Sequence, residues 1–281
     1  MTADGEPQPA DRWRPRLVAT DLDGTIVARD GTVSDRTVAA LRGVEALGVP
    51  VVFVTGRPVR WMAPLAERTG HTGLAICANG AVVYDLHDER IVAHDPMAIE
   101  VGLEVARRLR AAVPDVAFAV ETLEGFAHEA TYVARFDAGQ QLAVAPLDEL
   151  YTSPAIKLLA RHETMAPDDL LAAARDVVGD LAEVTHSSTD ALLEISAAGV
   201  SKATALARFA ADRGIDAADV VAFGDMPNDV AMLSWAGRGY AVEGAHPEAL
   251  AAVGVPGERR VVPRPEDDGV ARELERLFAL P

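Results

Sequence analysis

Several sequence features that are typical of particular classes of protein are scarce or missing in this chain. Among its 281 residues there is one cysteine, Cys77, which excludes an internal disulfide and fits a reducing, cytoplasmic setting. No apolar stretch approaches the roughly 20 residues that cross a bilayer. Lys and Arg number 26 against 43 Asp and Glu, and the formal net charge of −17 argues against nucleic acid or a membrane surface as the main partner.

Motifs of several common sites are also missing. The seven histidines show neither an i, i+4 pair nor the Cys/His spacing of a zinc site. There is no Walker-type phosphate loop, and no G-x-G-x-x-G follows an apolar strand pattern. Aromatic residues make up only 5% of a chain that is 49% hydrophobic, which indicates aliphatic packing of the kind found in buried parallel sheets.

Two carboxylates follow the first apolar run of the chain. The run Leu17-Val18-Ala19-Thr20 is short enough for a buried parallel strand, and it ends in Asp21-Leu22-Asp23-Gly24-Thr25. At the i, i+2 spacing, Asp21 and Asp23 leave an extended chain on the same face. Two anions held this close repel each other unless a cation neutralises them, and Mg²⁺ prefers oxygen ligands of this kind. A solvated Asp-Gly turn is the alternative interpretation.

A hydroxyl follows the second apolar run. Val51 to Val54 precede Thr55-Gly56-Arg57-Pro58, and the pattern predicts a helix from Pro58 to Thr69. A helix N-terminus offers unpaired N–H groups, and Thr55 adds a donor, so this segment is a candidate anion site. The structural alternative is that Thr55 is only a helix cap.

Two more segments complete the pattern. Lys202 stands at the start of a predicted helix that runs to about Arg213. A third buried-strand pattern, Val220 to Phe223, ends in Gly224-Asp225-Met226-Pro227-Asn228-Asp229. A solvated lysine and an ordinary turn are the structural alternatives. Because each polar group follows an apolar strand or opens a helix, we expect all of them at one edge of a sheet.

The four segments together resemble the haloacid dehalogenase superfamily of phosphohydrolases, and more narrowly the Cof-type branch of subfamily IIB. The resemblance covers roughly Leu17 to Phe278. Its motifs are Asp21-Leu22-Asp23-Gly24-Thr25, Thr55-Gly56-Arg57, Cys77-Ala78-Asn79-Gly80-Ala81, Gly199-Val200-Ser201-Lys202 and Gly224-Asp225-Met226-Pro227-Asn228-Asp229.

The resemblance implies a role for each motif. Asp21 is the nucleophile that forms an aspartyl-phosphate, and Asp23 is the general acid and base. Mg²⁺ is held by Asp21, the main-chain carbonyl of Asp23 and Asp225. The phosphoryl oxygens are bound by Thr55, Gly56, Lys202 and Asn228. For Asn228 and Asp229 the alternatives are contact with the phosphate, a place among the metal ligands, or orientation of Lys202, and Asn79 is a candidate substrate contact.

The fold class expected is α/β, a Rossmann-like doubly wound parallel-sheet core with an inserted α/β cap domain. The predicted division is a disordered tail at 1–16, a core at 17–84 and 199–281, and a cap at 85–198. Within the cap, strands are predicted at 116–121 and 131–136. The composition leaves the oligomeric state open.

Three functions fit this pattern. The first is a Mg²⁺-dependent phosphatase of small phosphorylated metabolites such as sugar phosphates. The second is a mutase like the phosphomannomutases, which share the scaffold but need a cap lined with phosphate-binding basic residues. The third, a catalytically silent binding protein, is disfavoured by the intact motifs. The basic candidates in the cap are few: Arg107, Arg108, Arg110, Arg135, Lys157 and Arg161.

Overall fold

The computed structural model describes residues 13–135, 142–254 and 260–281. Its first sheet has eight strands in the order β14-β13-β12-β1-β2-β3-β4-β5. Six of them are parallel, while β4 and β5 are antiparallel to their neighbours and extend one edge. The bounds are β1 (Leu17–Thr20), β2 (Val51–Val54), β3 (Leu74–Cys77), β4 (Val82–Asp85), β5 (Arg90–His94), β12 (Val220–Gly224), β13 (Arg238–Val242) and β14 (Val261–Val262).

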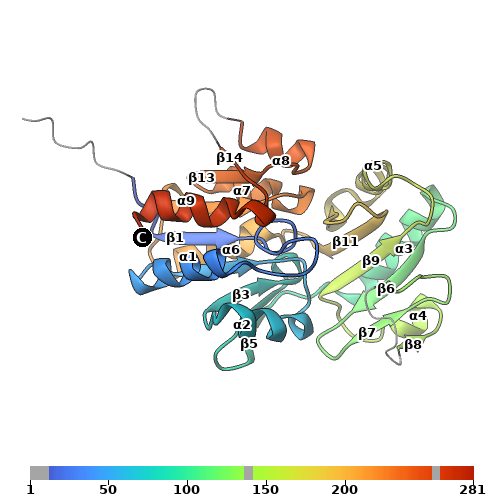
Figure 1. The fold of residues 1–281 in the computed structure, drawn as a ribbon. Coiled ribbons are helices and arrows are strands. Elements are labelled where there is room, and N and C mark those ends of the chain that lie inside the picture. Colours follow the sequence, from blue (N-terminus) through green and yellow to red (C-terminus); the bar gives the residue numbers. More distant parts are fainter. Residues whose placement is uncertain (1–12, 136–141, 255–259) are drawn as a thin grey trace, which may run out of the picture.

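Helices cover both faces of this sheet (Figure 1), as the short, wholly buried strands β1, β2 and β12 require. α1 (Asp35–Ala46) packs against α9 (Gly269–Phe278) on one face, with α2 (Ala63–Thr69) beside them. On the other face α6 (Lys202–Ala211) packs on α7 (Val230–Trp235), which contacts α8 (Pro247–Ala252). The predicted doubly wound α/β fold is therefore confirmed.

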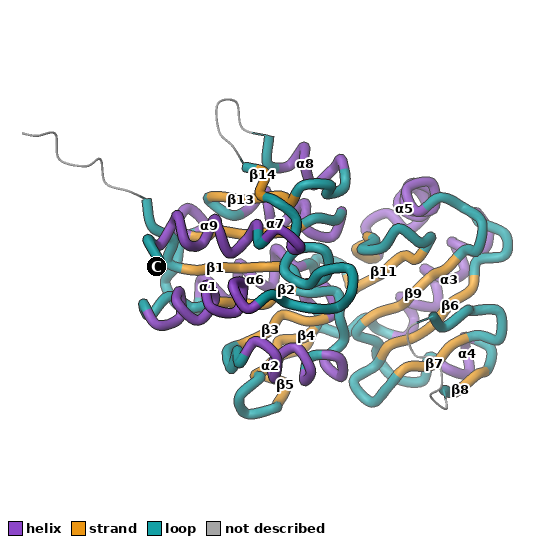
Figure 2. The backbone as a smooth tube through the Cα atoms, viewed as in Figure 1, coloured by secondary structure: helices purple, strands orange, loops and turns teal. Residues whose placement is uncertain are grey.

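A second sheet has six strands in the order β10-β11-β9-β6-β7-β8. Its helices α3 and α5 pack on each other and against one face only, over a buried aliphatic cluster. Figure 2 shows two lobes: the first lobe is the first sheet with its helices, and the second lobe is the second sheet with α3 and α5, where α5 lies at the end nearest α8. The bounds are β6 (Ala117–Glu121), β7 (Phe126–His128), β8 (Ala143–Val144), β9 (Lys157–Arg161), β10 (Ala182–Thr185), β11 (Leu192–Ala197), α3 (Ile99–Ala112), α4 (Leu147–Leu150) and α5 (Pro167–Val178).

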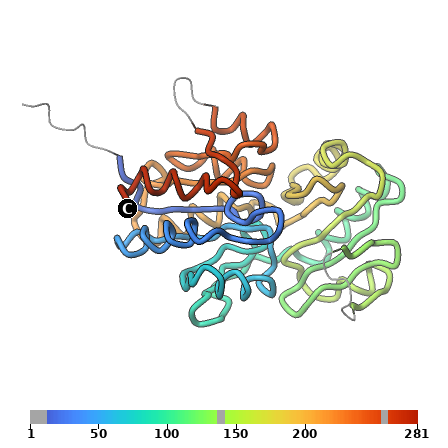
Figure 3. The backbone as a smooth tube through the Cα atoms, in the orientation of Figure 1, coloured from blue at the N-terminus to red at the C-terminus, as the bar shows by residue number. Residues whose placement is uncertain are grey.

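The chain passes from the first sheet to the second after β5 and returns after β11, as the colour sequence in Figure 3 shows. The predicted start of the inserted segment at residue 85 is therefore about ten residues too early, because β5 still pairs with β4. All five residues of β5 are exposed, so the strand has no buried face to mark it as part of the core. We propose that the inserted unit spans residues 95–198.

The predicted tail is wrong for its last residues. The Trp13 indole donates to the carbonyl of Ala218 at 3.0 Å and lies under the Arg238 guanidinium, so residues 13–16 pack on the first lobe. Residues 1–12 lie outside the described part of the chain. In the described ranges, no helix combines the length and the apolar character needed to cross a membrane.

The predicted helix from Pro58 to Thr69 is confirmed only from Ala63 onward. A single 3₁₀ turn at Val59–Trp61 is followed by the seven-residue helix α2, which begins at Ala63. Pro64 explains the break, because proline is tolerated in the first turn of a helix but not in its interior. Thr55 and Gly56 therefore do not lead into a long helix, and the anion site expected there does not gain a helix dipole. Further 3₁₀ turns lie at Ala78–Gly80, Gly179–Leu181, Ala217–Asp219, Pro227–Asp229 and Pro265–Asp267.

Candidate active site

The carboxyl ends of β12, β1 and β2 lie side by side, and each is followed by a polar motif. The Asp21 amide donates to the carbonyl of Phe223 on β12 at 2.9 Å, and the Thr55 amide donates to Ile76 at 2.8 Å. These main-chain bonds continue the sheet just past the strand ends. They bring Asp21, Thr55 and Asp225 to one edge, as the sequence pattern predicts.

Lys202 connects two carboxylates in the floor of this edge. Its Nζ donates to Oδ1 of Asp21 at 2.6 Å and to Oδ1 of Asp229 at 2.7 Å. Only 1% of the Lys202 side chain is exposed, and Asp229 is fully buried. The lysine is the first residue of α6, where Ser201 caps the helix by accepting from the Thr204 amide. The helix start therefore fixes where this buried cation lies.

Asp229 uses both of its oxygens within the protein. Oδ1 binds Lys202, while Oδ2 accepts from the main-chain amides of Asp225 and Met226 at 3.0 Å each. The carboxylate thus stabilises the turn that carries Asp225 and holds the lysine in place. Of the three roles considered for Asp229, these contacts match the one in which it orients Lys202.

Burial raises the pKa of the two remaining carboxyl groups, those of Asp21 and Asp225. Desolvation raises the pKa of Asp21 to about 7, opposed by the Lys202 ammonium and reinforced by Asp229. Desolvation together with the charges of Asp21 and Asp229 raises the pKa of Asp225 to about 9. The protein alone therefore does not compensate the negative charge gathered here. A cation is the simplest complement to such a cluster.

The residues present fit a magnesium ion. One carboxylate oxygen from each of Asp21, Asp225 and Asp229 lies within 4.8 Å of the others, so the donor set is all oxygen. Gly24 permits this close approach: a Cβ there would lie 2.3 Å from Oδ2 of Asp225, and its φ of +81° is strained for other residues. Asp21 and Asp225 are the members whose oxygens are not all used by the protein.

Two asparagines lie beside this cluster. Nδ2 of Asn228 donates to Oδ1 of Asn79 at 3.0 Å, and both side chains are buried. Asn228 lines the cavity described below, whereas Asn79 does not. The expected substrate contact from Asn79 is therefore not supported, because the residue lies behind Asn228 in a left-handed conformation, with φ at 55°.

Arg57 lies in the site, although its motif predicted no role for it. Its Nε and Nη2 donate to the two carboxylate oxygens of Asp23 at 2.7 and 2.5 Å. The hydrogen bonds to Asp23 raise the pKa of Arg57 further above its usual value. Thr55, nearly fully buried, accepts from the Arg57 amide at 3.0 Å through its hydroxyl. The segment after β2 is thus tied to both Asp23 and Thr55.

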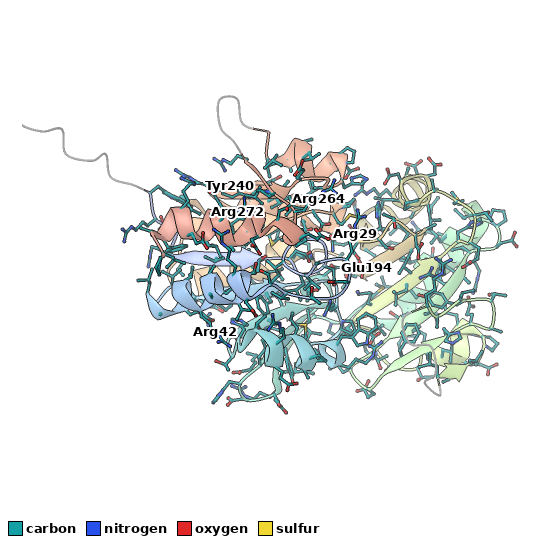
Figure 4. All side chains as sticks on the ribbon, viewed as in Figure 1. Arg29, Arg42, Glu194, Tyr240, Arg264 and Arg272 are labelled. Carbon is teal, nitrogen blue, oxygen red and sulfur yellow. The ribbon has the colours of Figure 1, made fainter. Side chains whose placement is uncertain are left out.

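A cavity of about 560 Å³ lies between the two lobes, directly over these residues. The second sheet contributes charged side chains that the sequence did not identify as site residues, among them Glu121 and Glu194. Glu194, labelled in Figure 4, lies where the lobes meet. The lining residues from the first lobe include Asp21, Asp23, Thr55, Gly56, Arg57, Arg60, Trp61, Asp225 and Asn228, and those from the second include Glu121, Phe126, Tyr132, Arg135, Lys157, Leu159, Ser187, Leu192 and Glu194.

The chain is similar to known proteins over most of its length. An HMP-PP phosphatase of Yersinia enterocolitica is 28% identical over 270 residues, which are 95% of this chain and 96% of that protein. A Streptococcus mutans protein superposes with a TM-score of 0.80 at 18% identity, covering 94% of this chain and 99% of the other. A haloalkanoate-superfamily phosphatase of Bacteroides thetaiotaomicron gives a TM-score of 0.78 at 20% identity, covering 98% and 99%.

A solved subclass IIB sugar phosphatase has the same fold, with a TM-score of 0.76 at 18% identity over 94% of this chain and 99% of the other. The family model for haloacid dehalogenase-like hydrolases matches residues 18–274 of the sequence. This range contains every motif on which the resemblance was based, so the expectation of an enzyme of this superfamily is confirmed. The chain belongs to the haloacid dehalogenase-like hydrolase family.

Proposed function

We propose that the protein is a Mg²⁺-dependent phosphomonoester hydrolase of small phosphorylated metabolites, acting through an aspartyl-phosphate on Asp21. The observation that carries the proposal is the placement of Asp21. Its carboxylate lies in the floor of the cavity, held by Lys202 at 2.6 Å and adjacent to Asp225. The names of similar proteins, an HMP-PP phosphatase and a sugar phosphatase, support a small phosphorylated substrate.

Asp21 and Asp23 divide the chemistry between them. An Asp21 oxygen attacks phosphorus, a new O–P bond forms, and the bond from phosphorus to the leaving oxygen breaks. Asp23 gives its proton to that oxygen and then takes one from the water that attacks the aspartyl-phosphate. Phosphate leaves, and both carboxyl groups return to their starting states.

The other residues position Asp21 and stabilise the negative charge of the phosphoryl group during these steps. Lys202 donates to Oδ1 of Asp21, and in the proposal Oδ2 is the attacking oxygen. Lys202, Thr55, Gly56 and Asn228 bind the phosphoryl oxygens in the proposal. When bound by Asp21, the Asp23 carbonyl and Asp225, Mg²⁺ neutralises charge on the phosphoryl group.

The mutase alternative is disfavoured by the state of the cap cations. A mutase has to bind a second phosphate in the cap, which requires basic side chains that are not already neutralised. The six candidates each form an ion pair with a carboxylate: Arg107 and Arg108 with Glu104, Arg110 with Glu129, Arg135 and Arg161 with Asp190, and Lys157 with Glu194. Hydrolysis is therefore the better match.

Phosphate release from a panel of phosphomonoesters tests the proposal. Activity should vanish with a chelator and return with Mg²⁺, while Zn²⁺ should restore it poorly because the site has no soft ligands. Asp21→Asn keeps the side-chain volume and should abolish release in a folded protein. Restoration by Zn²⁺ alone would contradict the metal assignment. Isomerisation of a hexose phosphate without release of phosphate would support the mutase.

A further inference from the structure

Three side chains that can bind a metal meet between the two lobes, outside the carboxylate cluster of the active site. Asp168 and His186 belong to the second lobe, at the start of α5 and just after β10, and His246 caps α8 of the first lobe. Nε2 of His186 lies 2.9 Å from Oδ1 of Asp168, and Nε2 of His246 lies 3.2 Å from the same oxygen. One donor atom from each residue lies within 4.8 Å of the others.

The hydrogen bonds of His186 leave its Nε2 facing a carboxylate without a proton. Nδ1 lies 3.1 Å from the carbonyl of Ser188, and a carbonyl only accepts, so Nδ1 is the donor of this ring. A neutral imidazole carries one N–H, so Nε2 then directs a lone pair at Oδ1 of Asp168. A cation between the two atoms removes this repulsion. A histidine that binds a metal usually donates its other N–H in this way, to a carbonyl or a carboxylate.

A second proton on His186 is the alternative to a metal ion. It would turn the contact with Asp168 into an ion pair, but it would serve only two of the three side chains. A metal ion also uses Nε2 of His246. Binding there places the single N–H of that ring on Nδ1, and the bond that Nδ1 accepts from the Glu248 amide at 3.2 Å is lost. Water can replace this bond because it is exposed to solvent.

The donor atoms favour a transition metal over magnesium. Two imidazole nitrogens and a carboxylate oxygen are common ligands of Zn²⁺, and at bond lengths of about 2.0–2.2 Å the ligand atoms of a tetrahedral site lie about 3.3 Å apart. The N–O separations of 2.9, 3.2 and 3.3 Å are close to this value. The His186 side chain is buried, whereas that of Asp168 is 63% exposed. The exposed side gives the ion a way in and leaves the fourth position to water.

Both histidines are attached to segments that line the cavity. The His246 amide donates to the carbonyl of Asp225 at 2.8 Å, so this ligand is anchored to a loop of the active site. In the second lobe, Ser187 and Ser188 follow His186 directly and also line the cavity. The cluster therefore lies at the rim of the cavity, with ligands from both lobes. An ion bound here opposes separation of the lobes.

We infer that Asp168, His186 and His246 form a Zn²⁺ site that bridges the two lobes and slows turnover by holding them together. The metal binding is independent of the proposed phosphatase function, whereas the effect on turnover rests on it. Substrate and phosphate have to enter and leave a cavity that lies between the lobes, so opening is part of the catalytic cycle. Zn²⁺ at the rim slows this opening and leaves the chemistry at Asp21 unchanged.

Metal titration of the full chain tests the site. Saturating Mg²⁺ keeps the active-site carboxylates occupied, and Co²⁺ serves as a coloured substitute for Zn²⁺. We expect one equivalent of Co²⁺ to give the visible absorption of a site with nitrogen ligands, and one equivalent of Zn²⁺ to abolish it. His246→Asn and Asp168→Asn should each weaken Zn²⁺ binding by about a hundredfold or more.

The choice of variants separates a metal ligand from a structural residue. Asparagine is a good helix cap, so His246→Asn keeps the start of α8. Asp168 is mostly exposed, so Asp168→Asn keeps the fold. His94→Ala is the matched control, because it removes an exposed histidine of β5 and should leave Zn²⁺ affinity unchanged. In saturating Mg²⁺, Zn²⁺ should inhibit phosphate release by the wild type and by His94→Ala, but not by His246→Asn.

The outcomes assign each part of the inference. Equal Zn²⁺ affinity in the wild type and His246→Asn, or no binding beside Mg²⁺, would show that His186 carries a second proton and that the metal assignment is wrong. Zn²⁺ binding without inhibition of phosphate release would show that the ion does not hold the lobes together. If no ester releases phosphate with Mg²⁺ alone, the proposed function fails, and the metal titration still decides whether the Zn²⁺ site exists.

Discussion

Arg57 forms a bidentate ion pair with Asp23, in which Nε donates to Oδ2 at 2.7 Å and Nη2 donates to Oδ1 at 2.5 Å. The Asp23 side chain is 58% exposed, so little else restrains it. The general acid of the proposed mechanism is therefore placed by an arginine from the next strand end. Arg57 acts as a positioning residue, and it has to release one oxygen of Asp23 when the leaving group takes its proton.

Arg57→Ala should therefore slow hydrolysis most for the esters whose leaving oxygen has to be protonated. An alkyl phosphate requires protonation of its leaving oxygen, whereas p-nitrophenyl phosphate releases a stable phenolate. We expect kcat for the alkyl ester to fall about tenfold or more and kcat for the nitrophenyl ester to change little. Asp23→Asn should show the same selectivity. Equal losses on both esters would mean that Arg57 does not act through Asp23.

Lys202→Met should lower the free energy of unfolding by about 3–5 kcal/mol, because it leaves two buried carboxylates without their cation. Lys202 donates to both Asp21 and Asp229, and these charges raise its pKa despite the opposing effect of burial. Urea denaturation measures the loss. Arg208→Met on the same helix is the control, since its exposed pair with Asp95 should contribute no more than about 1 kcal/mol. Similar losses for both variants would refute the role given to Lys202.

The stabilisation by Mg²⁺ should increase with pH. Without metal, the pKa of Asp21 is raised to about 7 and that of Asp225 to about 9, well above the ordinary value near 4. The folded protein then keeps protons that the unfolded chain has lost, so stability falls as pH rises through this range. Mg²⁺ binds the deprotonated carboxylates and offsets that loss.

Thermal unfolding with Mg²⁺ and with chelator measures this effect. The difference in Tm should be small near pH 5 and larger near pH 9. A difference that is constant across the range would show that proton loss from these carboxylates is not linked to metal binding.

Gly56→Ala should impair activity more than stability. A Cβ at residue 56 would lie 3.1 Å from Oε1 of Glu194 and 3.2 Å from Oδ1 of Asn79, so it would press on the cap carboxylate. We expect kcat/KM to fall about tenfold while the urea midpoint moves little. Gly254→Ala, whose Cβ would meet only ordinary contacts, is the control. Unchanged kcat/KM in Gly56→Ala would show that Glu194 tolerates displacement from this position.

The core of the site was predictable because its geometry follows from strand ends. Asp21, Thr55 and Asp225 each follow a buried aliphatic run, and parallel neighbours bring such positions to one edge. Lys202 was predictable from the helix start after Ser201. These inferences needed only local patterns and the general rule for open α/β sheets.

The cap side was not predictable in the same way. Lys157 and Glu194 meet because β9 and β11 are paired antiparallel, and that register cannot be read from either strand alone. The three-residue strand β7 at Phe126–His128 is too short to show alternation, whereas no strand forms in the described residues of the predicted 131–136 segment. Residue 136 lies outside the described part of the chain.

Detection of a phosphorylated Asp21 tests the central claim most directly. The full chain is mixed with Mg²⁺ and a hydrolysed ester, quenched with acid within the first turnover, and examined by mass spectrometry of the intact protein and of its peptides. The account predicts a mass increase of one phosphoryl group on the peptide that contains Asp21, absent from Asp21→Asn. Phosphate release at the wild-type rate from Asp21→Asn, or label on another residue, would contradict it.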